Sequence, residues 1–116
     1  MYIIPDRDKP IVWVGSALAD LRRFPDAARQ AAGLQLRRVQ VGLAPDDWKP
    51  MPTIGTGVCE IRLRRGAAYR VFYVAKFEEA VFVLHAFEKR TRKTRLMDLE
   101  LARSRLAEVL RQRKRL

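Results

Sequence analysis

Apolar and charged side chains alternate most clearly in the middle of this chain. From residue 58 to 64 the apolar positions are Cys59, Ile61 and Leu63, and the charged positions between them are Glu60, Arg62 and Arg64. A period of two predicts a strand with one buried and one solvated face. Arg65 and Gly66 then give a turn signal, because glycine adopts positive φ without strain. A second strand is predicted over 68–75.

A third strand is predicted from Ala80 to Phe87, where the chain is almost wholly apolar. Such a run is typical of a central strand that is covered on both faces. The segment that follows, residues 88–95, has five basic residues in eight and a single acid. The pattern therefore predicts a short sheet that ends in a basic loop.

The N-terminal part of the chain predicts one strand and two helices. Apolar residues at 11–14 indicate a short strand, and Ser16 is a suitable N-cap for a short helix that ends before Pro25. From Ala28 to Leu43 apolar positions recur in steps of three and four, which indicates one face of a second helix. Two helices joined at a tight break form a helical hairpin that needs a sheet to cover.

A loop rich in proline and glycine is predicted over 42–57, and it contains Trp48 and Lys49. This pair could hold a base and a phosphate, but packing of Trp48 over the edge of the core is the favoured interpretation. A last helix is predicted over 94–112, with acids near its start and cations at its end, as the helix dipole favours.

These elements predict the order β-α-α-β-β-β-α in a single domain spanning residues 1–116. We expect an α+β fold with an antiparallel sheet of about four strands, an N-terminal helical hairpin and a C-terminal helix, with the helices on one side of the sheet. A chain of 116 residues is long enough for one core but not for two.

Composition adds a strong charge signal to this fold. The chain has 24 Lys and Arg against 13 Asp and Glu, a net charge of +11. Arginine predominates, and its planar guanidinium binds phosphate bidentately and stacks on bases. RNA, DNA or a strongly acidic protein are the expected partners. An arginine-rich genome would explain part of this excess but not its clustering beside a sheet.

Other composition features exclude several classes of protein. A single cysteine, Cys59, excludes an internal disulfide, and a single histidine, His85, argues against a zinc site. No apolar run approaches the roughly 20 residues that span a bilayer. We expect no secretory signal at the N-terminus, because Pro5, Asp6, Arg7 and Asp8 interrupt its apolar run. We therefore expect a cytoplasmic protein.

Three segments together resemble the RelE/HigB/ParE toxin superfamily, and the phage-derived HigB-like branch in particular. They are the strand Gly57–Arg62, the strand Tyr69–Tyr73, and the ending Val83–Thr94. The resemblance runs from about residue 11 to 110. It implies a RelE-like fold and the toxin half of a type II toxin–antitoxin pair, neutralised by an antitoxin that is often a helix-turn-helix protein. Such toxins commonly enter the ribosome and cut mRNA without a metal or cofactor, through attack of a ribose 2′-OH that leaves a 2′,3′-cyclic phosphate.

The resemblance also implies roles for individual residues. Arg70 matches the arginine of the family's tyrosine–arginine strand and is the expected phosphate clamp; Arg62 and Arg90 match basic positions on the preceding strand and after the last strand. Glu60 is the candidate general base. The residues expected to hold the RNA backbone are Lys49, Lys89, Arg92 and Lys93. Leu96 stands where RelE has a tyrosine.

Plainer interpretations of the same residues remain open. Glu60 and Arg62 could form a solvated ladder on an exposed strand face. His85 is more often a core histidine than an acid–base group, given its apolar neighbours. Two other functions also remain open: a ParE-like, non-enzymatic inhibitor of DNA gyrase, and a phage-derived module that only binds nucleic acid.

Overall fold

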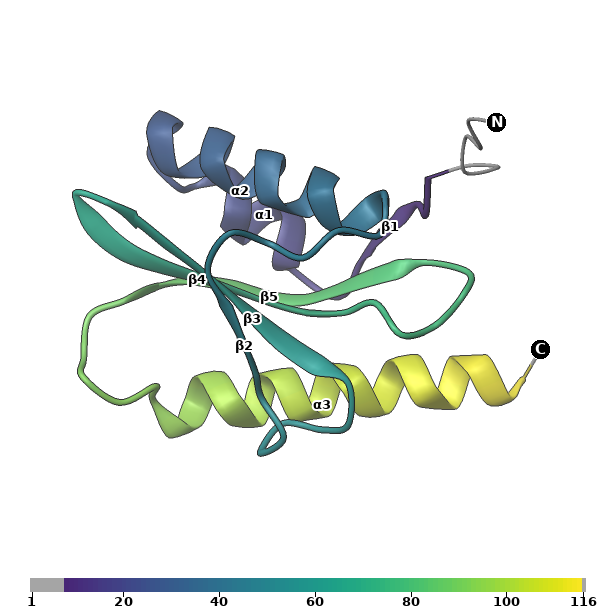
Figure 1. Ribbon diagram of the computed structural model, residues 1–116. Helices are drawn as coiled ribbons and strands as arrows, with labels where there is room; N and C mark the ends of the chain where they lie inside the picture. The colour runs from purple at the N-terminus through teal and green to yellow at the C-terminus, as the bar shows by residue number, and fades with distance from the viewer. Residues whose placement is uncertain (1–7, 116) are drawn as a thin grey trace, which may run out of the picture.

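The computed structural model describes residues 8–115 as one five-stranded sheet with three helices. Its elements in chain order are β1 (Ile11–Trp13), α1 (Ala17–Arg22), α2 (Asp26–Gln40), β2 (Trp48–Pro50), β3 (Val58–Arg65), β4 (Ala67–Val74), β5 (Val81–Lys89) and α3 (Leu96–Lys114). The order of strands across the sheet is β1-β5-β4-β3-β2 (Figure 1). The α+β class and the order of the longer elements are confirmed.

The sheet is mixed rather than wholly antiparallel. The β3–β4 hairpin turns at Gly66, whose φ of 79° only glycine adopts readily, and β5 continues antiparallel beside β4. At the other edge β1 runs parallel to β5, with Ile11 opposite Val81. The prediction of about four antiparallel strands was wrong on this point, because β1 adds a parallel edge strand beside β5, with α1, α2 and three strands between the two in the chain.

The helices lie on both faces of the sheet, and the prediction that they share one side was wrong (Figure 1). On one face α1 and α2 cover a core that includes Ile61, Val71 and Val83. On the other face α3 covers a second core built on Phe72 and Leu84. Both faces of the central strands are apolar, so each face needs a helical cover. β5 is buried on both faces, as its apolar run indicated.

The segment around Trp48 was predicted as loop, but Trp48–Pro50 forms the short edge strand β2. Its pairing places Trp48 opposite Ile61 and Lys49 opposite Glu60. Trp48 is 41% exposed and lines a hollow at the edge of the core together with Val39, Cys59 and Tyr73. Pairing with only one neighbouring strand leaves the indole at the rim of the sheet.

No helix in residues 8–115 has both the length and the apolar character needed to cross a bilayer.

The turn before β3 fits tightly under α3, and this contact yields a stability prediction. A Cβ at Gly55 would overlap the side chain of Leu106, which is 7% exposed in the core. We expect Gly55→Ala to lower the free energy of unfolding by about 1–3 kcal/mol, because overpacking strains a filled core. Urea unfolding would measure the loss. In a Leu106→Ala background the added methyl should cost less than in the wild type, and an equal cost in both would contradict this account.

Candidate functional site

The sheet face on the side of α3 has two parts. The helix covers an apolar part, and a charged part is open to solvent. The pairing of the strands puts Arg62 directly opposite Arg70 and Lys49 directly opposite Glu60. Residues that are directly opposite in neighbouring strands share a face, as do residues two apart along a strand. Three strands therefore bring the predicted residues Lys49, Glu60, Arg62 and Arg70 onto one surface.

Glu60 lies at the centre of this surface and is buried, with 1% of it exposed. Its Oε1 accepts a hydrogen bond of 3.1 Å from Nε of Arg62, and Nε of Arg70 lies 3.5 Å from the same oxygen. The expectation that Glu60 faces solvent on a wet strand face was wrong. The two arginines lie over the carboxylate and shield it, so the charged positions of the strand form a buried ionic cluster instead of a solvated ladder.

Arg70 is the more buried arginine of this cluster: its side chain is 11% exposed, against 35% for Arg62. Burial lowers the pKa of Arg70, and the charge of Glu60 opposes that shift; the guanidinium stays charged at any physiological pH. Its Nη1 donates a 3.0 Å hydrogen bond to the carbonyl of Tyr69. Two contacts thus fix the orientation of this side chain.

Two buried polar atoms at the cluster have no hydrogen-bond partner among residues 8–115: Oε2 of Glu60 and Nε of Arg70. Buried polar groups are usually satisfied, and one that is not calls for an explanation such as a ligand or a water molecule. One is an acceptor and the other a donor, so a ligand with both a hydroxyl and an anionic oxygen would satisfy them together.

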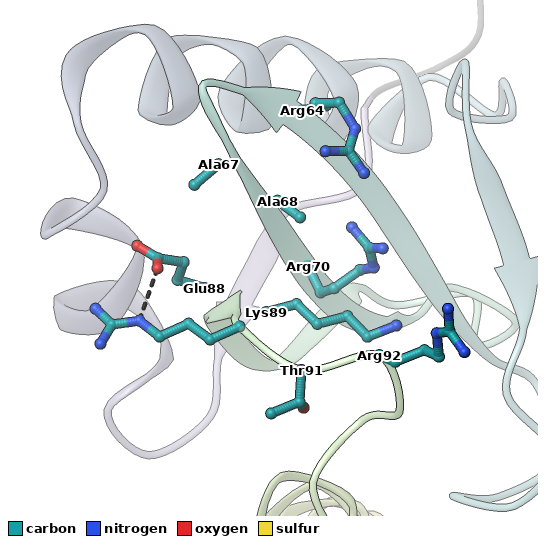
Figure 2. Close-up of a pocket in the computed structure, with 9 residues that line it drawn as sticks. Arg64, Ala67, Ala68, Arg70, Glu88, Lys89, Thr91 and Arg92 are labelled. Carbon is teal, nitrogen blue, oxygen red and sulfur yellow. Dashed lines mark hydrogen bonds and ion pairs between the residues drawn. The ribbon is translucent and has the colours of Figure 1, made fainter.

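A pocket of about 520 Å³ adjoins the cluster beside the end of β5. Its lining consists of Arg64, Ala67, Ala68, Arg70, Glu88, Lys89, Arg90, Thr91 and Arg92. The side chains of Arg64, Arg70, Lys89 and Arg92 extend to one side of the pocket, away from Glu88 (Figure 2). Five cations against one acid make this pocket suitable for an anion.

Lys89 is the lysine whose pKa is most clearly shifted by its surroundings. Burial lowers its pKa, and the positive charge of Arg70 lowers the pKa further. No hydrogen bond or ion pair joins its side chain to another residue of the described chain. Its ammonium therefore remains available to a ligand.

Not all of the predicted residues converge here. Arg90 lines the pocket, but its Nε donates to Glu88 at 2.7 Å and the side chain is 78% exposed. Lys93 is exposed in the loop after β5 and does not line the pocket. The site is therefore Glu60, Arg62 and Arg70 with Lys49, Lys89 and Arg92 around them, and Arg90 at the rim.

Comparison with known families gives one match, which covers residues 19–107 and is described as Phage derived protein Gp49-like (DUF891). This chain belongs to the Gp49-like family. The family is part of the RelE/HigB-like group of toxin–antitoxin toxins, and it implies an antitoxin partner. No curated protein matches the sequence.

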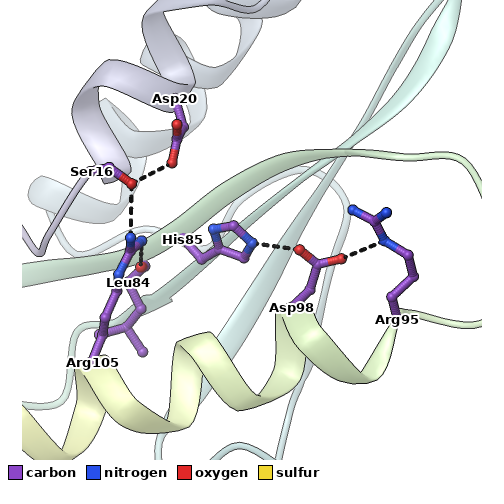
Figure 3. A network of polar contacts seen from close by, with 7 residues as sticks. All are labelled: Ser16, Asp20, Leu84, His85, Arg95, Asp98 and Arg105. Atoms are coloured by element: carbon purple, nitrogen blue, oxygen red, sulfur yellow. Dashed lines mark hydrogen bonds and ion pairs between the residues drawn. The ribbon is translucent and has the colours of Figure 1, made fainter.

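The Gp49-like domain also contains a buried polar pair that the sequence did not reveal. His85 is 6% exposed and stacks on Phe87, with 4.7 Å between ring centroids. Its Nε2 lies 2.7 Å from Oδ1 of Asp98, whose Oδ2 accepts from Arg95 at 3.2 Å (Figure 3). His85 is thus a core residue, as its neighbours indicated. Asp98 precedes buried Ala102 by four positions, and this helical spacing was the available signal that it is buried.

Burial lowers the pKa of His85, although its hydrogen bond to Asp98 opposes that shift. The imidazole is therefore neutral at pH 7, and Nε2 carries the proton that binds the carboxylate. Within residues 8–115, no three His, Cys, Asp or Glu side chains gather as metal ligands would.

Arg64 is the basic residue of the pocket that the sequence-based assignment left out. It continues the alternation of Glu60 and Arg62 along β3, so the period of two placed it on the same face. Its position in the pocket extends the basic surface from the ionic cluster to the β3–β4 turn.

Proposed function

We propose that this Gp49-like protein is a ribosome-dependent endoribonuclease that cuts mRNA and so inhibits translation. In this mechanism Arg62 and Arg70 bind the reacting phosphate, and Glu60 takes the proton from the adjacent 2′-OH. The 2′ oxygen attacks phosphorus and leaves a 2′,3′-cyclic phosphate. Lys49, Lys89, Arg92 and Lys93 hold the neighbouring RNA backbone. Arg90, paired with Glu88, contacts the backbone from the rim.

The observation that carries this proposal is the ionic cluster on the open sheet face. Two guanidinium groups converge on one buried carboxylate, so donors for a phosphorane and an acceptor for a hydroxyl proton lie within a few ångströms. Preorganised charges of this kind stabilise a transition state without reorganisation during the reaction. Arg62 is the more exposed of the pair, and its displacement by RNA would release Oε1 of Glu60 from the hydrogen bond that Arg62 donates.

The same charge distribution supports the proposed partners. A net charge of +11 favours ribosome-bound mRNA as the substrate and an acidic antitoxin as the inhibitor. The proposed antitoxin is a helix-turn-helix protein that blocks the open half of the sheet. Residues 1–116 would act as one toxin domain in the cytoplasm, where ribosomes are found.

Brief, tightly controlled induction of the chain without an antitoxin tests this function. We expect growth to stop and new 5′ ends to appear within translated regions of mRNA, and not in transcripts that ribosomes do not read. Mapping of transcript 5′ ends provides the measurement. Co-expression of the antitoxin should restore growth and intact mRNA.

Two outcomes would favour the alternatives. Intact mRNA with DNA-damage signalling would indicate a gyrase inhibitor. Binding to RNA that weakens steeply with salt, without cleavage on ribosomes, would indicate a nucleic-acid-binding module.

A further inference from the structure

The proposed cleavage needs a group that protonates the departing 5′ oxygen, because an alkoxide is a poor leaving group. Few candidates exist near the ionic cluster. His85 is in the core under α3 with its Nε2 bound to Asp98. Tyr69 and Tyr73 are each 4% exposed in the core under α1 and α2, on the opposite face of the sheet. Leu96, which is 62% exposed at the start of α3, has no proton to give.

We propose that Lys89 is the general acid of this site and transfers its ammonium proton to the 5′ oxygen of the leaving nucleotide. This inference rests on the proposed nuclease function and adds a catalytic residue to it. Binding of the RNA backbone requires only the positive charge of Lys89, whereas a general acid must also lose a proton. Experiments can therefore separate the two roles.

The position of Lys89 supports this role. It is the last residue of β5 and lies opposite Ala68, while Arg70 lies opposite Phe87 two positions earlier. Lys89 and Arg70 therefore share the open face, and both line the 520 Å³ pocket. Figure 2 shows the Lys89 side chain extended along the pocket on the side of Arg70 and Arg92. A phosphate held by Arg70 would lie on the same face as this ammonium, and the proposal directs its 5′ oxygen toward the pocket.

The electrostatic surroundings of Lys89 make its proton easier to transfer than that of an ordinary lysine. Burial is the largest cause of its lowered pKa, followed by the charge of Arg70; Lys49 and Arg62 act in the same direction. Glu60 opposes them. A general acid is most effective when its pKa approaches the working pH, and the neighbouring guanidinium groups cannot serve because they do not deprotonate.

The complete step balances without a further reactant. The 2′-O–P bond forms as the proton of the 2′-OH passes to the Glu60 carboxylate. The P–O5′ bond breaks as the Lys89 ammonium gives its proton to O5′. The products are a 2′,3′-cyclic phosphate, a 5′-OH, a protonated Glu60 and a neutral Lys89 amine, and exchange with solvent restores both side chains.

An mRNA with sulfur in place of the bridging 5′ oxygen at the cleavage site tests this role, because a thiolate leaves without being protonated. We expect Lys89→Ala to slow single-turnover cleavage of ordinary mRNA on ribosomes by about 10²- to 10⁴-fold, the usual contribution of a general acid. On the sulfur-containing mRNA the same variant should cut within about tenfold of the wild-type rate.

Two further variants separate charge from proton transfer. Lys89→Arg keeps the positive charge but has no usable proton, so it should resemble Lys89→Ala on ordinary mRNA and bind the ribosome–mRNA complex normally. Lys93→Ala removes an exposed lysine of the neighbouring loop. It should leave the ratio of the cleavage rates on ordinary and sulfur-containing mRNA unchanged. Circular dichroism of each variant checks that the fold is retained.

The outcomes distinguish this inference from the proposed function itself. If Lys89→Ala is slowed equally on both substrates, or Lys89→Arg retains full activity, Lys89 binds phosphate and is not the acid. If Lys49→Ala is slow on ordinary mRNA and recovers its rate on the sulfur-containing mRNA, while Lys89→Ala does not, Lys49 is the acid. A wild type that cuts neither substrate on ribosomes overturns the nuclease function and the role of Lys89 with it.

Discussion

Replacement of Arg70 by alanine is expected to abolish toxicity and to reduce cleavage of ribosome-bound mRNA by at least about 10²- to 10³-fold. Arg70 is nearly buried, is oriented by the carbonyl of Tyr69 and lies 3.5 Å from the carboxylate of Glu60. Its removal takes away the best-fixed positive charge at the proposed phosphate site. Growth after induction and single-turnover cleavage would measure the effect.

The same substitution should also destabilise the fold. It leaves Glu60 buried with only Arg62 as its partner, and we expect the free energy of unfolding to fall by about 1–3 kcal/mol. A double variant, Glu60→Gln with Arg70→Met, removes both charges and should recover most of this stability without recovering toxicity. Arg29→Ala on α2, where the arginine pairs with Asp26 at the surface, is the matched control and should change neither property. An Arg70→Ala protein with full activity would contradict the proposed site.

Replacement of Asp98 by alanine is expected to give one of the largest losses of stability in the protein, about 2–4 kcal/mol. Asp98 is 5% exposed and accepts hydrogen bonds from both His85 and Arg95. Without it the imidazole stays buried with neither ring nitrogen paired. Urea unfolding at pH 7.5 would measure the change, and a loss below about 1 kcal/mol would contradict the assignment of His85 and Asp98 as a core pair.

This pair also predicts how stability depends on pH. The pKa of His85 is lower in the folded protein than in the unfolded chain, so the unfolded chain binds a proton first as the pH falls. The contribution of neutral His85 is complete above about pH 6.5, the ordinary pKa of histidine, and decreases below it. Between pH 6.5 and 5.5 the wild type should lose up to about 1 kcal/mol more than a His85→Gln variant, measured by urea unfolding.

The sequence predicted the parts of this fold that depend on local pattern. The alternation at 58–64 and the glycine at 66 predicted the β3–β4 hairpin, and the apolar run at 80–87 predicted a strand covered on both faces. These features depend on side chains a few residues apart, so a single sequence contains them.

Features that depend on distant residues were not predictable in the same way. Alternation shows that Glu60 shares a face with Arg62, but only the pairing with β4 brings Arg70 over the carboxylate and buries it. The sequence also did not show which face of the sheet α3 covers. The buried side of this helix includes the polar Asp98, which interrupts its apolar stripe. The sequence singled out Glu60 and the arginines around it, but it did not show that this carboxylate is buried.

The parallel pairing of β1 with β5 has a consequence for synthesis on the ribosome. Residues 11–13 emerge early but cannot find their place in the sheet until residues 81–83 have been made. Closing such a long loop is slow compared with local folding. The nascent chain therefore lacks its finished edge, and Lys89 lacks its position, until the segment of β5 has been translated. Under the proposed function, the ribosome that makes this chain must read past the codon for Lys89 before its product can act on any ribosome.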